Sequence, residues 1–169
     1  MTDTLDIQIS IEEGDWPEEA SLLALCEPVL AAAETWLKTK ESQPFPKHPV
    51  ELSLLFTNDA SIREINAEWR EQDKPTNVLS FPAYPLEPGG MPGPMLGDII
   101  FAYETVAREA AELEKPFEAH LSHLLVHGFL HLFGYDHMND EEATIMEGLE
   151  TRILLGLGLS DPYAGTELT

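Results

Sequence analysis

The sequence has a single cysteine, few basic residues and no long uninterrupted apolar run. Cys26 cannot form an internal disulfide, and its apolar surroundings, LLALCEPVL, predict a buried thiol. No apolar stretch approaches the length needed to cross a bilayer, and no basic start followed by an apolar segment marks a secretory signal. We therefore expect a cytoplasmic protein that has no membrane partner.

Positive charge is also scarce: 31 Asp and Glu residues stand against 9 Lys and Arg, a formal net charge of −22. This composition lacks the basic footprint of a nucleic-acid-binding surface, and its simplest interpretation is solubility. Any RNA substrate would have to be held by a small local patch, by a metal ion or through a partner protein. At 169 residues the chain is long enough to bury the core of one domain.

Hydrophobic periodicity predicts the order β-α-β-α-β-β-α-α-α. The expected strands are 5–10, 50–57, 76–82 and 96–101. The expected helices are 17–40, with Pro28 kinking it or starting a second helix, 58–70, 103–114, 117–133 and 139–155. This order implies one α/β (α+β) domain over residues 1–160, in which helices pack on a small mixed sheet of about four strands, followed by a polar tail, 161–169. The segment AYPLEPGGMPGPM (83–95) is either a loose hairpin loop or a functional lid.

Five of the six histidines fall within eighteen residues, in and after the expected helix 117–133. His127 and His131 are four residues apart and share a helix face, and a turn at Gly134 would bring His137 back toward them. Three neutral imidazoles with an open fourth position are typical of a catalytic rather than a structural zinc site. Buried histidines are often only hydrogen-bonded core residues, but the H-x3-H-x5-H spacing around a glycine turn favours metal binding.

Four other residues of this region have expected roles of their own. His120 is expected on the surface or in a structural role, and His123, one turn before His127, is a candidate to line the site. Asp136 would orient a ligand or occupy the fourth position. Gly128 stands where proteases of the H-E-x-x-H type carry a glutamate general base, so peptide hydrolysis by that mechanism is disfavoured.

The stretches HGFLHLFGYDH (127–137), KPTNVLSFP (74–82) and LGDIIF (96–101) make the chain resemble the YbeY family of bacterial endoribonucleases over nearly its whole length. The resemblance implies a zincin-like metallohydrolase in which His127, His131 and His137 bind one Zn²⁺. It also implies cleavage of single-stranded RNA in maturation of the 16S rRNA 3′ end and in ribosome quality control. The expected partners are therefore ribosomal RNA, the small ribosomal subunit and ribosomal proteins.

The same resemblance implies that Arg70 is important for activity, and a forked guanidinium is suited to holding phosphate. Without the resemblance, the simpler interpretation of Arg70 is a solvated residue at the end of a helix. Many relatives have aspartate where this chain has Asn77, whose expected role is to shape the start of a strand.

The general base stays open among Asp136, His123 and Asp98, and RNA could instead supply its own 2′-hydroxyl. Asp98 follows Gly97 at an expected strand start, so a turn-forming role fits it equally. Two rival functions also stay open. One is a non-catalytic ribosome-assembly factor with a structural metal, and the other is a metal-dependent hydrolase acting on a peptide or a small molecule.

Overall fold

The computed structural model describes residues 5–159, so the predicted tail 161–169 lies outside the described residues. The strands are β1 (Leu5–Ile11), β2 (Val50–Thr57), β3 (Val78–Pro82) and β4 (Met95–Ala102). The helices are α1 (Glu19–Lys40), α2 (Asp59–Arg70), α3 (Tyr103–Glu112), α4 (Phe117–Leu132) and α5 (Asp140–Gly156). The predicted order and the predicted fold class, an α+β domain with a four-stranded mixed sheet, are confirmed.

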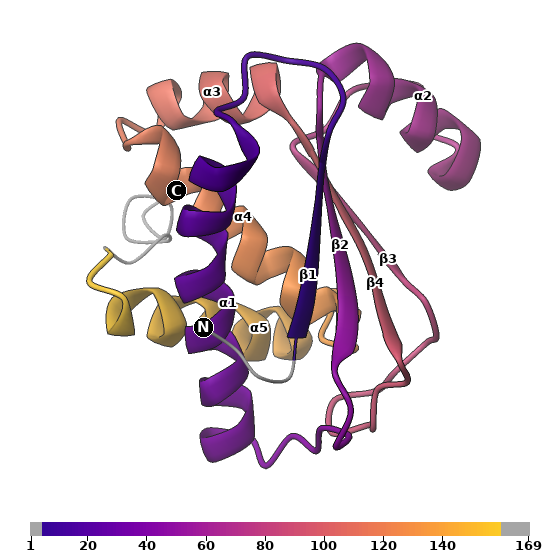
Figure 1. The fold of residues 1–169 in the computed structure, drawn as a ribbon, viewed down its shortest axis with the longest axis vertical. Helices are drawn as coiled ribbons and strands as arrows, with labels where there is room; N and C mark the ends of the chain where they lie inside the picture. The colour runs from indigo at the N-terminus through magenta and orange to yellow at the C-terminus, as the bar shows by residue number, and fades with distance from the viewer. Residues whose placement is uncertain (1–4, 160–169) are drawn as a thin grey trace.

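The sheet has the strand order β1-β2-β4-β3. β1 pairs with β2 and β2 with β4 in parallel, whereas β3 is antiparallel to β4 because a loop without a helix joins them. Figure 1 shows α1, α4 and α5 on one face of the sheet and α2 on the other. β3 is therefore an edge strand, and α4 packs directly against it.

Side-chain alternation along the strands gives each face of the sheet its own core. The larger core lies between the sheet and α1, α4 and α5, and from β2 it takes Val50, Leu52, Leu54 and Phe56. A smaller cluster lies beneath α2 and consists of Ile62, Leu79, Ile100 and Ala102. From Ile99 to Ala102, β4 is thus buried on both faces.

Helix α1 is continuous, so the alternative that a second helix begins at Pro28 is wrong. By length and composition alone it is apolar enough to cross a membrane, contrary to the expectation that no stretch of the chain is. Here it packs against α4, α5 and β1, as a core helix of a globular domain does. Cys26 is fully buried within it, and burial raises the pKa of its thiol to about 12, which confirms the predicted buried thiol.

The loop 83–95 is connected to the body of the domain by hydrogen bonds to Gln43. Nε2 of the buried Gln43 donates a hydrogen bond to the Gly90 carbonyl (2.7 Å), and the Gly89 amide donates to Gln43 Oε1 (3.2 Å). The loop also passes over Gly134, where a Cβ would overlap the Leu86 carbonyl. It therefore forms a wall beside the end of α4.

Gly128 marks a close approach between α4 and the sheet. A Cβ at this position would lie 2.9 Å from Cγ2 of Ile99, which is buried and β-branched and cannot easily move. We expect Gly128→Ala to lower the free energy of unfolding by about 1–3 kcal/mol through overpacking, measured by urea denaturation.

Gly148→Ala is the matched control for that substitution. Gly148 lies within α5, where a Cβ would meet only the flexible guanidinium of Arg152 at 3.4 Å. Alanine there should stabilise the protein by about 0.5–1 kcal/mol, because it lowers the entropy lost on helix formation. Equal effects of the two substitutions would contradict the close packing inferred at Gly128.

Candidate metal centre

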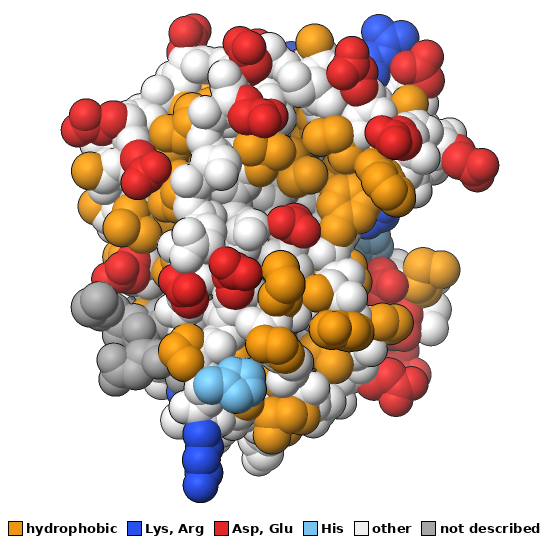
Figure 2. Space-filling view, turned by 45° about the vertical axis from the view of Figure 1, so that its right-hand side comes forward, with side chains coloured by type: hydrophobic (Ala, Val, Ile, Leu, Met, Phe, Trp, Pro, Cys, Tyr) orange, Lys and Arg blue, Asp and Glu red, His pale blue; other side chains and the backbone are white. Residues whose placement is uncertain are grey.

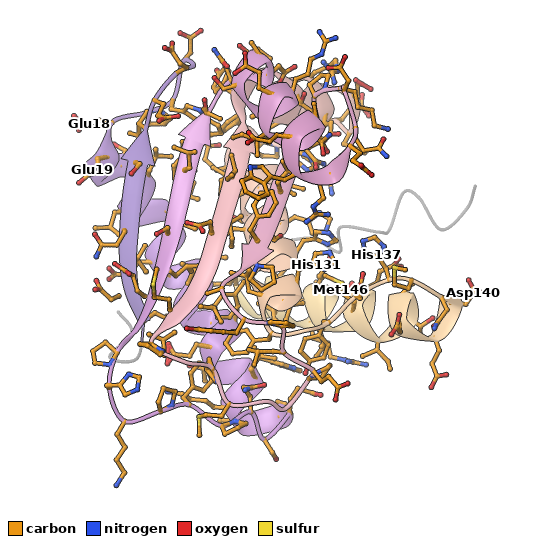
Figure 3. All side chains as sticks on the ribbon, turned by 90° about the vertical axis from the view of Figure 1, so that its right-hand side faces the viewer. Glu18, Glu19, His131, His137, Asp140 and Met146 are labelled. Atoms are coloured by element: carbon orange, nitrogen blue, oxygen red, sulfur yellow. The ribbon has the colours of Figure 1, made fainter. Side chains whose placement is uncertain are left out.

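The structure brings the three predicted metal ligands together. Nε2 of His127 lies 3.1 Å from Nε2 of His131, and one ring nitrogen from each of His127, His131 and His137 lies within 4.8 Å of the others. Figure 3 shows His131 and His137 close together beside the sheet, near the end of α4. Nitrogens bound to one tetrahedral zinc are about 3.3 Å apart, so the cluster fits such an ion after a small movement.

The turn after α4 places His137. Gly134 has φ of 97°, a left-handed conformation that favours glycine, and the Tyr135 amide donates a hydrogen bond back to the Leu130 carbonyl (3.2 Å). The chain therefore reverses within three residues and returns a third imidazole beside the helix. This is the geometry that the H-x3-H-x5-H spacing predicts.

The histidines open into a groove of about 790 Å³. Its walls come from the end of α2, the segment leading into β3, the loop 83–95 and the turn after α4. His127 and His131 are partly buried whereas His137 is exposed, so the cluster is accessible from the groove. An accessible three-histidine cluster is the arrangement of a catalytic site, because a structural zinc site is closed by a fourth protein ligand.

Glu150 of α5, which the sequence analysis did not single out, supports the cluster from behind. Its carboxylate is 1% exposed and accepts hydrogen bonds from Nε2 of His123 (2.6 Å) and Nδ1 of His127 (2.9 Å). Burial alone would raise the pKa of Glu150, but these two hydrogen bonds outweigh it and hold the pKa at about 2. Since a carboxylate only accepts, it keeps the proton of His127 on Nδ1 and turns the Nε2 lone pair toward His131.

A signal for Glu150 does exist in the sequence. It lies on the face of α5 that carries the buried Met146 and Ile153, where an acidic residue needs a partner. His123 and His127 are the partners of Glu150. His123 is not among the residues that line the groove. The expectation that His123 lines the site is therefore not met, and its place is behind the site.

Burial is the main cause that lowers the pKa of His131 to about 4. Electrostatic interactions with the neighbouring His127 and His137 lower it further, while the charge of Asp136 and a hydrogen bond with the Tyr135 backbone act in the opposite direction. The His131 ring is therefore neutral at pH 7, which is the form that binds a metal ion.

His120 and Asn77 meet at a different carboxylate. His120 is buried, so its surface alternative is wrong, and its Nε2 lies 2.9 Å from Oε1 of Glu109. Nδ2 of Asn77 donates to the same oxygen (2.9 Å), and Oδ1 of Asn77 accepts from the Val78 amide (2.7 Å). Because β3 begins at Val78, the predicted role of Asn77 in shaping the strand start is confirmed.

Arg70 is the last residue of α2 and lines the groove with the histidines. Its Nη2 donates a hydrogen bond to the Ser80 carbonyl (2.8 Å), and its guanidinium lies 5.2 Å from the centre of the Phe81 ring. In Figure 2 a basic side chain and a histidine meet in a notch at the right-hand edge of the molecule. The two contacts of Arg70 position its guanidinium in the groove, where it can donate to an anion.

The two aspartates that were candidates for the general base lie in different places. Asp136 lines the groove, and its Oδ1 accepts a hydrogen bond from the His137 amide (2.8 Å). Asp98 is exposed within β4, shares a face with Ile100 beneath α2, and is not among the groove residues. The structure does not bring Asp98 to the histidines, and a turn at this residue is also wrong because the strand continues through it.

The supporting role of Glu150 gives a direct test. Glu150→Gln keeps the shape but makes the side chain neutral and able to donate, so the proton on His127 is no longer fixed. We expect Zn²⁺ affinity to fall about 10–100-fold in a competition titration against a chromogenic chelator. Glu147→Gln, on the exposed side of the same helix, is the control and should leave the affinity unchanged. Equal affinities for the two variants would refute the role of Glu150.

Comparisons with known proteins place this geometry in context. The family described as "Endoribonuclease YbeY" matches residues 16–158. A protein of that name from Sinorhizobium fredii is 72% identical over 159 residues, 94% of this chain and 92% of its own. Another from Agrobacterium fabrum is 72% identical over 163 residues, with 96% and 97% covered.

The solution structure of TM1509 from Thermotoga maritima shares the fold. It has a TM-score of 0.54 and 24% identity, and the match covers 93% of this chain and 98% of that one.

Proposed function

This chain belongs to the YbeY family of endoribonucleases, and from that premise we propose that it is a metal-dependent nuclease that cleaves single-stranded RNA in small-subunit rRNA maturation. The observation that carries the proposal is the convergence of three histidine nitrogens, within 4.8 Å of one another, in an open groove that also holds Arg70. A phosphodiester in this groove would meet an arginine and a metal-binding cluster together.

We assign the cluster one Zn²⁺ ion, because three neutral imidazoles without a thiolate are a common donor set of catalytic zinc. His127, His131 and His137 would hold it. Once bound, the ion would supply Lewis-acid chemistry to a phosphate group or a water molecule in the groove.

Two further side chains of the groove, those of Arg70 and Asp136, would take part in the reaction. As a nucleophile attacks the phosphorus and the P–O bond to the leaving ribose oxygen breaks, negative charge grows on the phosphoryl oxygens, and Arg70 donates hydrogen bonds to them from a guanidinium held by Ser80 and Phe81. Asp136 stays the protein's candidate to accept the proton of the nucleophile, since it lines the groove beside His137. The RNA 2′-hydroxyl is the alternative nucleophile and needs the same base.

Two rival functions lose support from the site. A structural metal in a non-catalytic assembly factor fits poorly with a cluster that faces an open groove. A peptidase of the H-E-x-x-H type needs a glutamate at residue 128, and α4 lies too close to Ile99 there for a side chain to enter without displacement.

The proposal extends to the setting in which the protein works, the cytoplasm, with the small ribosomal subunit as the carrier of its substrate. The net charge of −22 supports this, since a strongly acidic protein needs basic partners to approach RNA, and ribosomal proteins are basic.

Purified, zinc-loaded protein offered three substrates tests the proposed function. We expect it to cut a single-stranded RNA spanning the 16S rRNA 3′ end, to leave the same RNA intact when annealed to its complement, and to leave an unstructured peptide intact. Cleavage of the peptide but not of RNA would overturn the proposal.

A further inference from the structure

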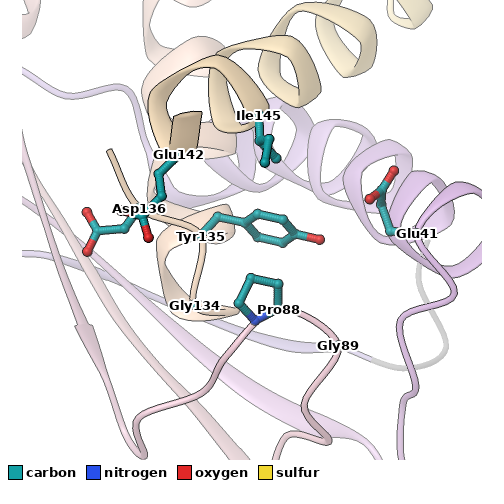
Figure 4. Close-up of a pocket in the computed structure, with 8 residues that line it drawn as sticks. All are labelled: Glu41, Pro88, Gly89, Gly134, Tyr135, Asp136, Glu142 and Ile145. Atoms are coloured by element: carbon teal, nitrogen blue, oxygen red, sulfur yellow. The ribbon is translucent and has the colours of Figure 1, made fainter. Parts of the chain in front are cut away.

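A second pocket, of about 360 Å³, lies on the other side of the turn that follows α4 (Figure 4). The end of α1, the anchored loop 83–95 and the first turns of α5 form its walls. Residues 134–136 line both this pocket and the groove, so the two cavities are neighbours with one shared wall. Apart from Asp136 in the shared wall, the proposed nuclease mechanism uses none of the residues that line the second pocket.

The pocket gathers negative charge that has no positive counterpart. Glu41, Asp136 and Glu142 line it, and no lysine or arginine is among its lining residues. One oxygen of Glu142 accepts a hydrogen bond from the Met138 amide (3.2 Å). Three carboxylates around one cavity attract a cation.

Tyr135 points independently to a ligand. The residue is only 7% exposed, yet its hydroxyl forms no hydrogen bond with any residue in the part of the chain that the structure describes. Figure 4 shows the ring crossing the pocket with the hydroxyl directed toward Glu41. A tyrosine hydroxyl can both donate and accept a hydrogen bond.

We propose that this pocket binds the guanidinium group of an arginine presented by a basic protein partner. The carboxylates offer charged acceptors to its N–H groups, and the buried Tyr135 ring offers an aromatic face to the cation. Pro88 and Ile145, the latter 50% exposed, provide apolar contact for the arginine methylenes. RNA is a poor occupant because the carboxylates repel its phosphates.

The two neighbouring cavities are thus expected to bind ligands of opposite charge. The groove binds anionic RNA, and the pocket binds a cationic arginine. A protein anchored through this pocket would lie against the turn that carries Asp136 and His137. Binding of the arginine does not depend on RNA cleavage, so failure of the proposed function and failure of this proposal are distinguishable.

Titration of ¹⁵N-labelled full-length protein with the peptide acetyl-Gly-Arg-Gly-amide, followed by NMR, tests the proposal. We expect saturable amide shifts at residues 41, 89, 134–136 and 142–145, and no such shifts with the same peptide carrying neutral citrulline. Glu41→Gln should weaken binding about fivefold or more, and Tyr135→Phe should weaken it as well because it removes only the hydroxyl.

Glu64→Gln, an exposed residue of α2 outside the pocket, is the control of equal charge change and should leave binding unchanged. Equal weakening by Glu41→Gln and Glu64→Gln would show general attraction to an acidic surface and overturn the proposal. Saturable shifts at these residues with spermidine but not with the arginine peptide would also overturn it, because the pocket would then select a free polyamine.

Discussion

Replacing His131 by alanine should remove both the bound metal and the cleavage of RNA. His131 supplies one of three converging nitrogens, and its neighbour His127 Nε2 lies only 3.1 Å away. Loss of a residue that merely orients a ligand weakens metal binding by about 10–100-fold, so loss of a ligand itself should weaken it by on the order of 10³-fold or more. Metal content by mass spectrometry and cleavage of a labelled single-stranded RNA are the two measurements.

His48→Ala is the control for this experiment. His48 is the one histidine outside the cluster region; it is exposed, and its Nδ1 lies near the Pro49 carbonyl (3.1 Å). That variant should keep one ion per chain and full activity. Circular dichroism of the His131 variant checks that the fold persists, and a folded variant that loses the metal yet cleaves RNA at the normal rate would contradict the metal's role.

Arg70→Glu should keep the metal and lose most of the cleavage. The side chain is no part of the histidine cluster, so the ligand set is unchanged. A carboxylate in place of the guanidinium repels the phosphate. It also offers no N–H donors to the phosphate oxygens on which negative charge develops. Loss of one such donor lowers kcat by about 10²–10³-fold, and the reversal of charge should act at least as strongly.

Arg70→Lys separates charge from geometry, because lysine keeps the charge but not the fork that contacts Ser80. It should be intermediate in cleavage rate. Arg108→Glu reverses the charge of an exposed arginine on α3 and should leave the rate unchanged. If Arg70→Glu cleaves like the wild type, or if it loses the metal, Arg70 does not have the role assigned to it.

The fold was predictable because local signals agree with one another. Apolar residues change from a period of two in VELSLLFT to helical spacing in NDASIREINAEWR, and Asn58 caps α2 by accepting from the Ser61 amide (2.8 Å). The three ligands were predictable for the same reason, since helical spacing and one glycine turn place them within a short segment.

The spacing of residues along the sequence does not reveal which side chains contact each other across the core. Glu150 lies 23 residues after His127, and only the packing of α5 on α4 brings them together. Trp69 shares its helical spacing with Ile62 and Ile65, yet it is 67% exposed whereas Ile62 is fully buried. Periodicity defines which face of a helix is apolar, and the extent of the sheet beneath it decides which residues on that face are covered.

The central claim is that a metal held by three histidines is required for cutting RNA, and removal and return of the metal tests it most directly. Protein stripped with a chelator should lose cleavage of single-stranded RNA. Titration with Zn²⁺ should restore cleavage in proportion to occupancy, up to one ion per chain. Full cleavage by protein that contains no metal would contradict the account.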